Sequence, residues 1–320
     1  MNYIEQLGEK ALEAKRKIAT ASTGEKNKVL EAIAQVLLEN SDAILAENEK
    51  DIANARDNGI SETMVDRLRL TKERIKGIAD ACMELVNLED PVGEVLQGSV
   101  RPNGMRITKV RVPMGVIGII YESRPNVTAD AFGLCFKTGN AVILRGGSDA
   151  LNSNLAITKV IAEALSACDL PADSIQLLTD TSHETAEKFM RLNEYIDVLI
   201  PRGGAGLIKT VVEKSTVPVI ETGTGNCHVY VDESADIDMA VNIIENAKTQ
   251  RYGVCNACES LVIHKKIAKD VLPKIADRLA EHGVEMRGDE YSMQCDRRIV
   301  KASEEDYGTE YLYSIISIKT

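Results

Sequence analysis

The chain has 320 residues, of which 44% are hydrophobic and 27% are charged, a composition typical of a globular protein that can bury its own core. At about 150 residues per domain, this length predicts two domains. The net charge of −11 and the absence of tryptophan argue against a general nucleic-acid binder, which needs a basic face and aromatic stacking platforms.

No segment of the sequence has the length and composition of a membrane anchor. The most apolar stretch, Val116 to Tyr121, is far shorter than the roughly 20 residues that span a bilayer. The first residues mix charges throughout and contain no apolar signal region. We therefore expect a cytoplasmic protein that does not insert into membranes, and we expect its seven cysteines to be thiols rather than a disulfide framework.

The first 90 residues have helical periodicity, with apolar residues at helical spacing in segments such as KVLEAIAQVLLENSDAILAENEKDIANA. Ser41 and Asp42 are typical caps for a new helix, and a further helix is predicted from Ser61 to about Asp90. Between residues 95 and 113, Asn103-Gly104 separates two strand-like runs and predicts a projecting β-hairpin. Such a hairpin suits either a subunit contact or a solvent-exposed ribbon.

Strands and helices alternate from residue 115 onwards. The predicted strands lie at 115–121, 141–145, 174–179, 196–201 and 217–221. This alternation predicts a parallel sheet with helices on both faces, which binds ligands beyond the carboxyl ends of its strands.

A second unit is expected to begin near Thr222. Its predicted elements are helices at 236–249 and 267–282 and strands at 260–264 and 311–319. The chain ends inside the last strand-like run, so we expect this domain to be incomplete at its carboxyl end.

Two glycine-rich turns follow predicted strands. In Arg202-Gly203-Gly204, backbone N–H groups and a helix N-terminus favour an anion such as a nucleotide phosphate. The pattern differs from the GxGxxG fingerprint, so an ordinary strand-to-helix turn is the alternative. Arg145-Gly146 follow another strand, and the guanidinium offers bidentate donors suited to the 2′-phosphate of NADP.

Cys255 lies in RYGVCNACES, a loop whose glycine and polar neighbours indicate exposure. Cys255 and Cys258 form a C-x-x-C pair, but a zinc site needs two further ligands, and a redox pair usually opens a helix. A single nucleophilic thiol is the better interpretation. Glu221 closes a predicted strand beside glycine-rich backbone, so it is either a candidate base or a solvent-exposed acid.

Several long segments resemble the aldehyde dehydrogenase superfamily. They are VPMGVIGIIYESRPNVTADAFGLCFKTGNAVILRGGSDALNSN, IETGTGNCHVYVD, AKTQRYGVCNACESLVIH and EEDYGTEYL. The resemblance implies an α/β fold with a Rossmann-type NADP-binding domain at 1–221, which includes the hairpin as an oligomerisation element. It also implies a second α/β catalytic domain at 222–320, incomplete at its carboxyl end.

The resemblance further implies roles for individual residues. Cys255 matches the nucleophile and Glu221 the recurring carboxylate, while Asn126, in the stretch that begins at Ser123, matches an oxyanion-stabilising amide. The residues that match cofactor-binding positions are Arg145, Gly146, Arg202, Gly203, Gly204 and Glu305.

The implied activity is the NADPH-dependent reduction of L-glutamyl 5-phosphate to L-glutamate 5-semialdehyde and phosphate through a cysteine thioester, the second step of proline biosynthesis from glutamate. The implied partners are this small-molecule substrate, further copies of the chain in a homo-oligomer, and glutamate 5-kinase in a transient contact. Two alternatives stay open: a coenzyme A-dependent acylating aldehyde dehydrogenase, and a fragment of the family that folds without turnover.

Overall fold

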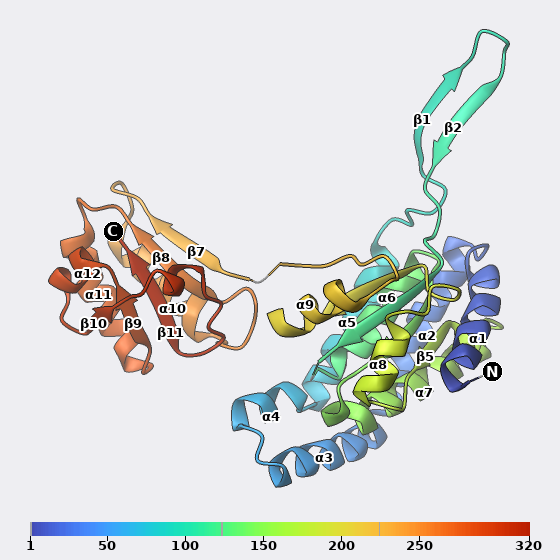
Figure 1. Ribbon diagram of the computed structural model, residues 1–320, viewed down its shortest axis with the longest axis horizontal. Helices are drawn as coiled ribbons and strands as arrows, with labels where there is room; N and C mark the ends of the chain where they lie inside the picture. The colour runs from blue at the N-terminus through green and yellow to red at the C-terminus, as the bar shows by residue number, and fades with distance from the viewer. Residues whose placement is uncertain (1, 123, 224) are drawn as a thin grey trace. The chain divides into compact units, whose positions relative to one another are not determined.

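The computed structural model describes residues 2–122, 124–223 and 225–320, with Thr63 described by its backbone alone. The chain divides into two compact units, Met1–Thr222 and Gly223–Thr320 (Figure 1). Each unit has its own hydrophobic core and its own parallel sheet. Among the described residues, no helix combines the length and the apolar character needed to cross a membrane.

The amino-terminal part of the first unit is helical. Its helices are α1 (Tyr3–Ile18), α2 (Thr23–Glu39), α3 (Ser41–Asp57), α4 (Glu62–Leu68) and α5 (Lys72–Asn87). Capping boxes begin α1 and α2, because Asn2 and Ser22 each exchange hydrogen bonds with a glutamate three residues further on.

The prediction of one helix from Ser61 to Asp90 is wrong, because the chain leaves the helical conformation between α4 and α5. There the backbone N–H of Leu70 donates to the side-chain oxygen of Asn48 at 2.7 Å, a long-range bond that competes with a helical one. Thr71 then caps α5 by accepting from the N–H of Arg74.

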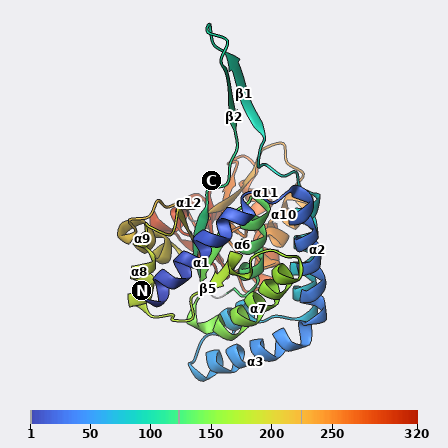
Figure 2. The same ribbon diagram turned by 90° about the vertical axis from the view of Figure 1, so that its right-hand side faces the viewer.

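The predicted hairpin is present as β1 (Val95–Val100) and β2 (Arg106–Val110), which pair antiparallel. Gly104 in its turn has a φ of +84°, a conformation that favours glycine. Every residue of both strands is exposed, and the ribbon projects from the rest of its unit in both views (Figures 1 and 2).

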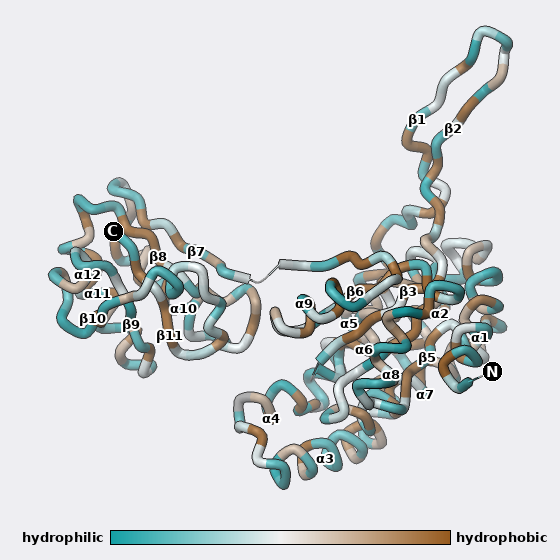
Figure 3. Tube along the Cα trace, viewed as in Figure 1, coloured by the Kyte–Doolittle hydropathy of each residue, from teal (hydrophilic) through white to brown (hydrophobic). Residues whose placement is uncertain are grey.

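The sheet of the first unit has parallel strands in the order β5-β4-β3-β6. They are β3 (Val116–Tyr121), β4 (Ala141–Arg145), β5 (Ile175–Leu177) and β6 (Val198–Arg202). The central strand β3 is buried throughout, as its continuous apolar run predicts, and Figure 3 shows it as a hydrophobic stretch. The predicted parallel sheet is therefore confirmed.

The predicted strand at 217–221 is wrong. Only Val219 forms a β-bridge, to Leu199 of β6, because Pro218 has no N–H to donate to a neighbouring strand.

Helices and short 3₁₀ turns connect the strands of this sheet. They are α6 (Asn126–Lys137), η1 (Ser148–Ala150), α7 (Leu151–Ala167), η2 (Ala172–Ser174), α8 (His183–Phe189) and α9 (Ala205–Lys214). Helices α1 and α6 pack on β4, α7 on β5 and α9 on β6, so the helices cover the sheet and leave its strand ends as the place for polar groups.

The second unit has a parallel sheet in the order β10-β9-β11-β8-β7. Its elements are β7 (Cys227–Val231), α10 (Ile237–Thr249), β8 (Cys258–Ile263), α11 (Ala268–Glu281), β9 (Glu285–Gly288), α12 (Glu290–Cys295), β10 (Ile299–Lys301), η3 (Glu305–Gly308) and β11 (Ile315–Lys319). The last strand begins at Ile315 rather than at 311, because Leu312 has a φ of +57° and interrupts the extended run.

Candidate active site

The candidate cofactor-binding residues of the first unit lie at the carboxyl ends of parallel strands. β4 ends at Arg145 and Gly146 follows, while β6 ends at Arg202 and Gly203 and Gly204 follow. β3 lies between these two strands, and its last two residues align with the two arginines. The structure therefore brings these five predicted residues to one edge of one sheet.

Arg145 is half-buried, and its Nη2 donates a hydrogen bond to the carbonyl of Thr181 at 2.6 Å. Its Nε is buried and has no hydrogen-bond partner within the described part of the chain. Burial lowers the pKa of the guanidinium, and the carboxylates of Asp149, Asp180 and Glu122 oppose that effect. A partly buried guanidinium with an unused Nε donor suits an anionic or hydroxyl-bearing ligand.

The turn at Gly146 rests on a chain of buried polar side chains. A Cβ at Gly146 would collide with the side-chain nitrogen of Asn154, a fully buried residue. The side-chain oxygen of Asn154 accepts from Thr128 at 2.9 Å, and Thr128 shares a 2.7 Å hydrogen bond with the hydroxyl of Tyr121. Only glycine fits above this chain, which links α7, α6 and β3 beneath the strand end.

The amino terminus of α9 already binds a carboxylate of this protein. The backbone N–H of Gly204 donates to Oε2 of Glu122 at 2.9 Å, and a Cβ at Gly203 would lie only 2.6 Å from that oxygen. The two glycines thus admit a close anion, as helix N-termini do. Glu122 is a residue that sequence reasoning missed, and the available signal was its place directly after β3.

Asn126 is the first residue of α6, and its side-chain nitrogen donates to Asp130 of the same helix at 2.9 Å. Burial raises the pKa of Asp130, and this hydrogen bond opposes the increase. Ser123, at the start of the stretch from which Asn126 is predicted, lies outside the described residues. Glu221 has an exposed side chain and lies at the end of the first unit.

Cys255 lies in the loop between α10 and β8, and its side chain is exposed. Its backbone is closely held, because the thiol of Cys227 donates to its carbonyl at 3.3 Å. A Cβ at Gly225 would collide with the same carbonyl. The Cys255 loop therefore has a fixed backbone and an accessible thiol, which is the arrangement that a nucleophile needs.

Cys258, the other member of the C-x-x-C pair, differs from Cys255. It is 2% exposed, and burial raises the pKa of its thiol to about 11. All seven cysteines are free thiols, and the described residues contain no group of three metal-ligating side chains. A buried thiol of high pKa is inert, so within this pair Cys255 is the candidate nucleophile.

Glu305 is exposed and begins η3. The turn is held by Asn226, whose side-chain nitrogen donates to the carbonyl of Tyr307 at 3.0 Å. Because Gly225 and Cys227 contact the Cys255 loop, the segment 225–227 joins the predicted nucleophile to the turn that carries Glu305. The structure thus brings these two predicted elements together within the second unit.

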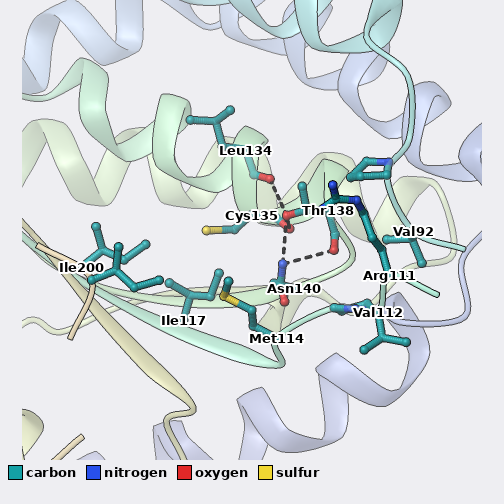
Figure 4. A pocket seen from close by; sticks show the side chains of 13 residues that line it. Val92, Arg111, Val112, Met114, Ile117, Leu134, Cys135, Thr138, Asn140 and Ile200 are labelled. Carbon is teal, nitrogen blue, oxygen red and sulfur yellow. Dashed lines mark hydrogen bonds between the residues drawn. The ribbon is translucent and has the colours of Figure 1, made fainter. Parts of the chain in front are cut away.

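A cavity of about 410 Å³ lies in the first unit at the base of the hairpin (Figure 4). Its walls include Val92, Met114 and Leu134, and Asn140 supplies a polar group that donates to Thr138. None of its lining residues is a predicted site residue, so this mostly apolar cavity is separate from the candidate active site.

Comparison with known proteins defines the class of this chain, an oxidoreductase that acts on an aldehyde. The model of the aldehyde dehydrogenase family matches residues 2–295, and the chain belongs to this family. Membership implies a nicotinamide cofactor. The strand ends fit one, because Arg145 Nε lacks a partner within the described residues and Gly203 leaves room for an anion at the α9 terminus.

The similar proteins narrow the class further. Gamma-glutamyl phosphate reductase from Lachnospira eligens is 61% identical over 320 residues, covering 100% of this chain and 77% of that protein. The protein of the same name from Clostridium botulinum is 58% identical over 319 residues, covering 100% of this chain and 77% of its own length. The chain is thus similar to gamma-glutamyl phosphate reductases over about three quarters of their length, and this agrees with the activity that the resemblance of its motifs implies.

Solved structures agree with this grouping. A gamma-glutamyl phosphate reductase from Thermotoga maritima has a TM-score of 0.90 and 49% identity, covering 99% of this chain and 77% of that one. An acetylating aldehyde dehydrogenase from Geobacillus thermoglucosidasius has a TM-score of 0.70 at 17% identity, covering 99% and 74%. The second likeness shows the fold alone. The predicted fold class and family are confirmed.

Proposed function

We propose that this chain uses NADPH to reduce L-glutamyl 5-phosphate to L-glutamate 5-semialdehyde and phosphate, the second step of proline biosynthesis from glutamate. The observation that carries the proposal is the exposed Cys255 thiol on a backbone held by Gly225 and Cys227. The names of relatives at 61% and 58% identity support the choice of substrate. The proposal makes residues 1–221 the NADP-binding domain, which also carries Asn126 and Glu221, and residues 222–320 the catalytic domain, which carries the nucleophile and Glu305.

In the proposed reaction the Cys255 thiolate attacks the γ-carbonyl carbon of the acyl phosphate. A C–S bond forms, the C–O bond to phosphate breaks, and phosphate leaves with the electron pair. The acyl group is then a thioester on Sγ. The backbone N–H of Cys255 is the first proposed oxyanion donor and the Asn126 amide the second. Asn126 must exchange its bond to Asp130 to serve in this role.

A nicotinamide cofactor supplies the hydride that reduces the thioester when it is bound. Arg145 would hold the 2′-phosphate, and Gly146 would admit the adenosine ribose. Gly203 and Gly204, with Arg202 beside them, would hold the pyrophosphate through backbone N–H groups, and Glu305 would hold the nicotinamide ribose.

Glu221 needs a role that differs from general-base activation of water. Water attack on the thioester would release glutamate and waste the activated acyl group, so a reductase must suppress it. We assign the exposed Glu221 carboxylate to positioning or to transfer of the proton that the departing phosphate takes up.

The hairpin supports self-association as part of the proposed function. Val95, Val100 and Met105 are 61%, 67% and 53% exposed, and an isolated two-stranded ribbon is marginally stable in water. A second copy of the chain would cover these side chains. Light scattering with size-exclusion chromatography should give a molecular mass that is a multiple of the 34.9 kDa chain mass. Val100→Lys should lower that measured mass.

We also propose a cytoplasmic location and a transient contact with glutamate 5-kinase.

The deciding experiment runs the reaction in reverse, with L-glutamate 5-semialdehyde and NADP. We expect NADP reduction only when inorganic phosphate is present, because phosphate must release the acyl group from Cys255. Reduction without phosphate would indicate ordinary aldehyde oxidation, and dependence on coenzyme A would indicate an acylating aldehyde dehydrogenase. No reduction under any of these conditions would support a fragment that folds without turnover.

A further inference from the structure

Two buried charged residues flank the Cys255 loop. Lys248 lies near the end of α10 and Glu259 near the start of β8. The Lys248 Nζ and the Glu259 Oε2 are 2.7 Å apart, and the two side chains are 0% and 1% exposed. The ion pair therefore closes the base of residues 249–258 inside the second unit.

Stability alone does not account for this pair. Removing each charge from water costs several kcal/mol, and apolar residues of similar volume often give an equally stable or more stable protein. Apolar replacements would have apolar neighbours in the core of the second unit, since Ile244 and Leu261 are both fully buried. The place of the pair at both flanks of the Cys255 loop points to a geometric role instead.

The second carboxylate oxygen of Glu259 extends the connection to another segment. Oε1 accepts a hydrogen bond from the backbone N–H of Leu312 at 3.0 Å. Leu312 has a φ of +57°, a conformation that is costly for a leucine and that persists where the surroundings impose it. Leu312 follows the η3 turn that begins at Glu305, so one carboxylate joins both flanks of the Cys255 loop to that turn.

Lys248 also contacts the loop itself. Its Nζ lies 6.0 Å from the centre of the Tyr252 ring, within the range of a cation–π contact. The hydroxyl of Tyr252 donates to the carbonyl of His282 at 3.3 Å. Together with the contacts of Gly225 and Cys227, these bonds hold the Cys255 backbone from several directions.

We propose that Lys248 and Glu259 are positioning residues that fix the Cys255 thiol and the Glu305 turn relative to each other. Neither residue touches the substrate in this proposal, and each acts through the backbone that it holds. The catalytic part of the inference rests on the proposed function. Its consequence is that loss of the pair slows thioester formation while nucleotide binding persists.

The test is the double variant Lys248→Met with Glu259→Gln, which removes both charges and keeps an acceptor for the Leu312 N–H. Because no unpaired buried charge remains, we expect it to fold. We expect kcat to fall about 10- to 100-fold, since small displacements of a nucleophile are costly, while the KM for NADPH stays within about twofold. Peptide mass spectrometry measures how fast iodoacetamide alkylates Cys255 at each pH. We expect this rate to differ between the double variant and the wild-type chain by about threefold or more.

The matched control is Lys26→Met with Asp90→Asn in the first unit. That ion pair is also buried, at 1% and 8% exposure, and has no proposed catalytic role. We expect wild-type kcat and wild-type Cys255 alkylation from the control. Cys168, a half-buried thiol of the first unit, is the internal reference for alkylation in every sample.

Wild-type kcat and alkylation in the folded double variant would overturn the proposal, and so would an equal loss in the control. If the double variant does not fold, Lys248→Arg keeps the buried charge paired while it displaces the loop. The proposal then requires that Lys248→Arg changes the alkylation rate of Cys255 but not that of Cys168. An unchanged rate at Cys255 would overturn the proposal. If the wild-type chain lacks acyl-phosphate reductase activity but the alkylation difference persists, the proposed function fails and the positioning role stands.

Discussion

The two units hold their candidate functional groups in opposite ways. In the first unit two donors at the strand ends are bound by the protein itself, since Arg145 Nη2 donates to the Thr181 carbonyl and the Gly204 N–H to the Glu122 carboxylate. In the second unit the Cys255 thiol is exposed while its backbone is held. The difference indicates that donors for an exchangeable ligand bind acceptors of the protein that the ligand can replace. A nucleophile instead needs a backbone that stays fixed.

The largest expected effect separates chemistry in the second unit from binding in the first. Cys255→Ser should lower kcat by roughly 10³-fold or more, because the poorer nucleophile cannot form the thioester at neutral pH. The Kd of NADPH, measured by fluorescence titration, should stay unchanged.

The other thiol of the C-x-x-C pair provides the control. Cys258→Ala removes a buried thiol of raised pKa and should keep most of the activity. Near-normal turnover by Cys255→Ser, or complete loss in Cys258→Ala alone, would reverse the assignment of the nucleophile.

A second prediction tests whether the strand ends of the first unit bind the cofactor. Arg145→Ala should weaken NADPH binding by about 10- to 100-fold, because charge-assisted hydrogen bonds to phosphate contribute about 1.5–3 kcal/mol. NADH, which lacks the 2′-phosphate, should lose less. Arg191→Ala, which removes an exposed arginine of the same unit, is the control in the same titration. Equal losses for the two nucleotides would remove the 2′-phosphate role of Arg145.

Both halves of this comparison were partly predictable from the sequence. Apolar runs that end in glycine-rich turns place Arg145 and Arg202 at strand ends, because parallel strands end on one edge of a sheet. The polar, glycine-containing neighbours of Cys255 predict its exposure. Local patterns are sufficient for these predictions because a strand end and the polarity of a loop depend on a few neighbouring residues, whereas the contacts that hold the side chains, such as Arg145 with Thr181, span longer stretches of the chain.

The residues that sequence reasoning missed depend on distant contacts. Glu122 meets Gly204 across 82 positions. Lys248 has a side chain that is 0% exposed, although a lysine on a helix is ordinarily exposed. The short strand β10 has only three residues, too few for a periodic pattern to be visible. At residues 217–221 sequence reasoning predicted too much structure. The apolar residues there indicate a strand, but Pro218 has no N–H to donate to a neighbouring strand.

A third prediction concerns the pH stability of the second unit. Burial raises the pKa of Asp306, but hydrogen bonds from Tyr311, Arg287 and Ser303 outweigh it and hold the pKa well below its usual value. Since the folded pKa is lower than the unfolded one, the carboxylate stabilises the folded unit at pH values above about 4, and this contribution is lost as the pH falls through the acid range.

Asp306→Asn should therefore lower the free energy of unfolding at neutral pH by about 1–2 kcal/mol, and the Tm should fall with it. The Tm difference from wild type should narrow as thermal melts are recorded below a pH of about 4. Asp277→Asn, which changes an acid whose side chain is 67% exposed, is the control and should have little effect at any pH. A Tm difference that is constant with pH would contradict the linkage.

The smallest expected effect tests whether the Glu122 carboxylate in the first unit competes with the cofactor for the N-terminus of α9. If the Glu122 carboxylate occupies the amides that a pyrophosphate needs, then Glu122→Gln should tighten NADPH binding by about two- to fivefold. Glutamine still accepts from the Gly204 N–H, so the start of α9 stays capped while the repulsion between carboxylate and phosphate disappears. ADP should gain in the same way, and adenosine, which has no phosphate, should not. Glu184→Gln, a change of an exposed acid on α8, should leave all three affinities unchanged. Weaker binding of NADPH by Glu122→Gln would mean that this carboxylate supports the nucleotide instead of competing with it.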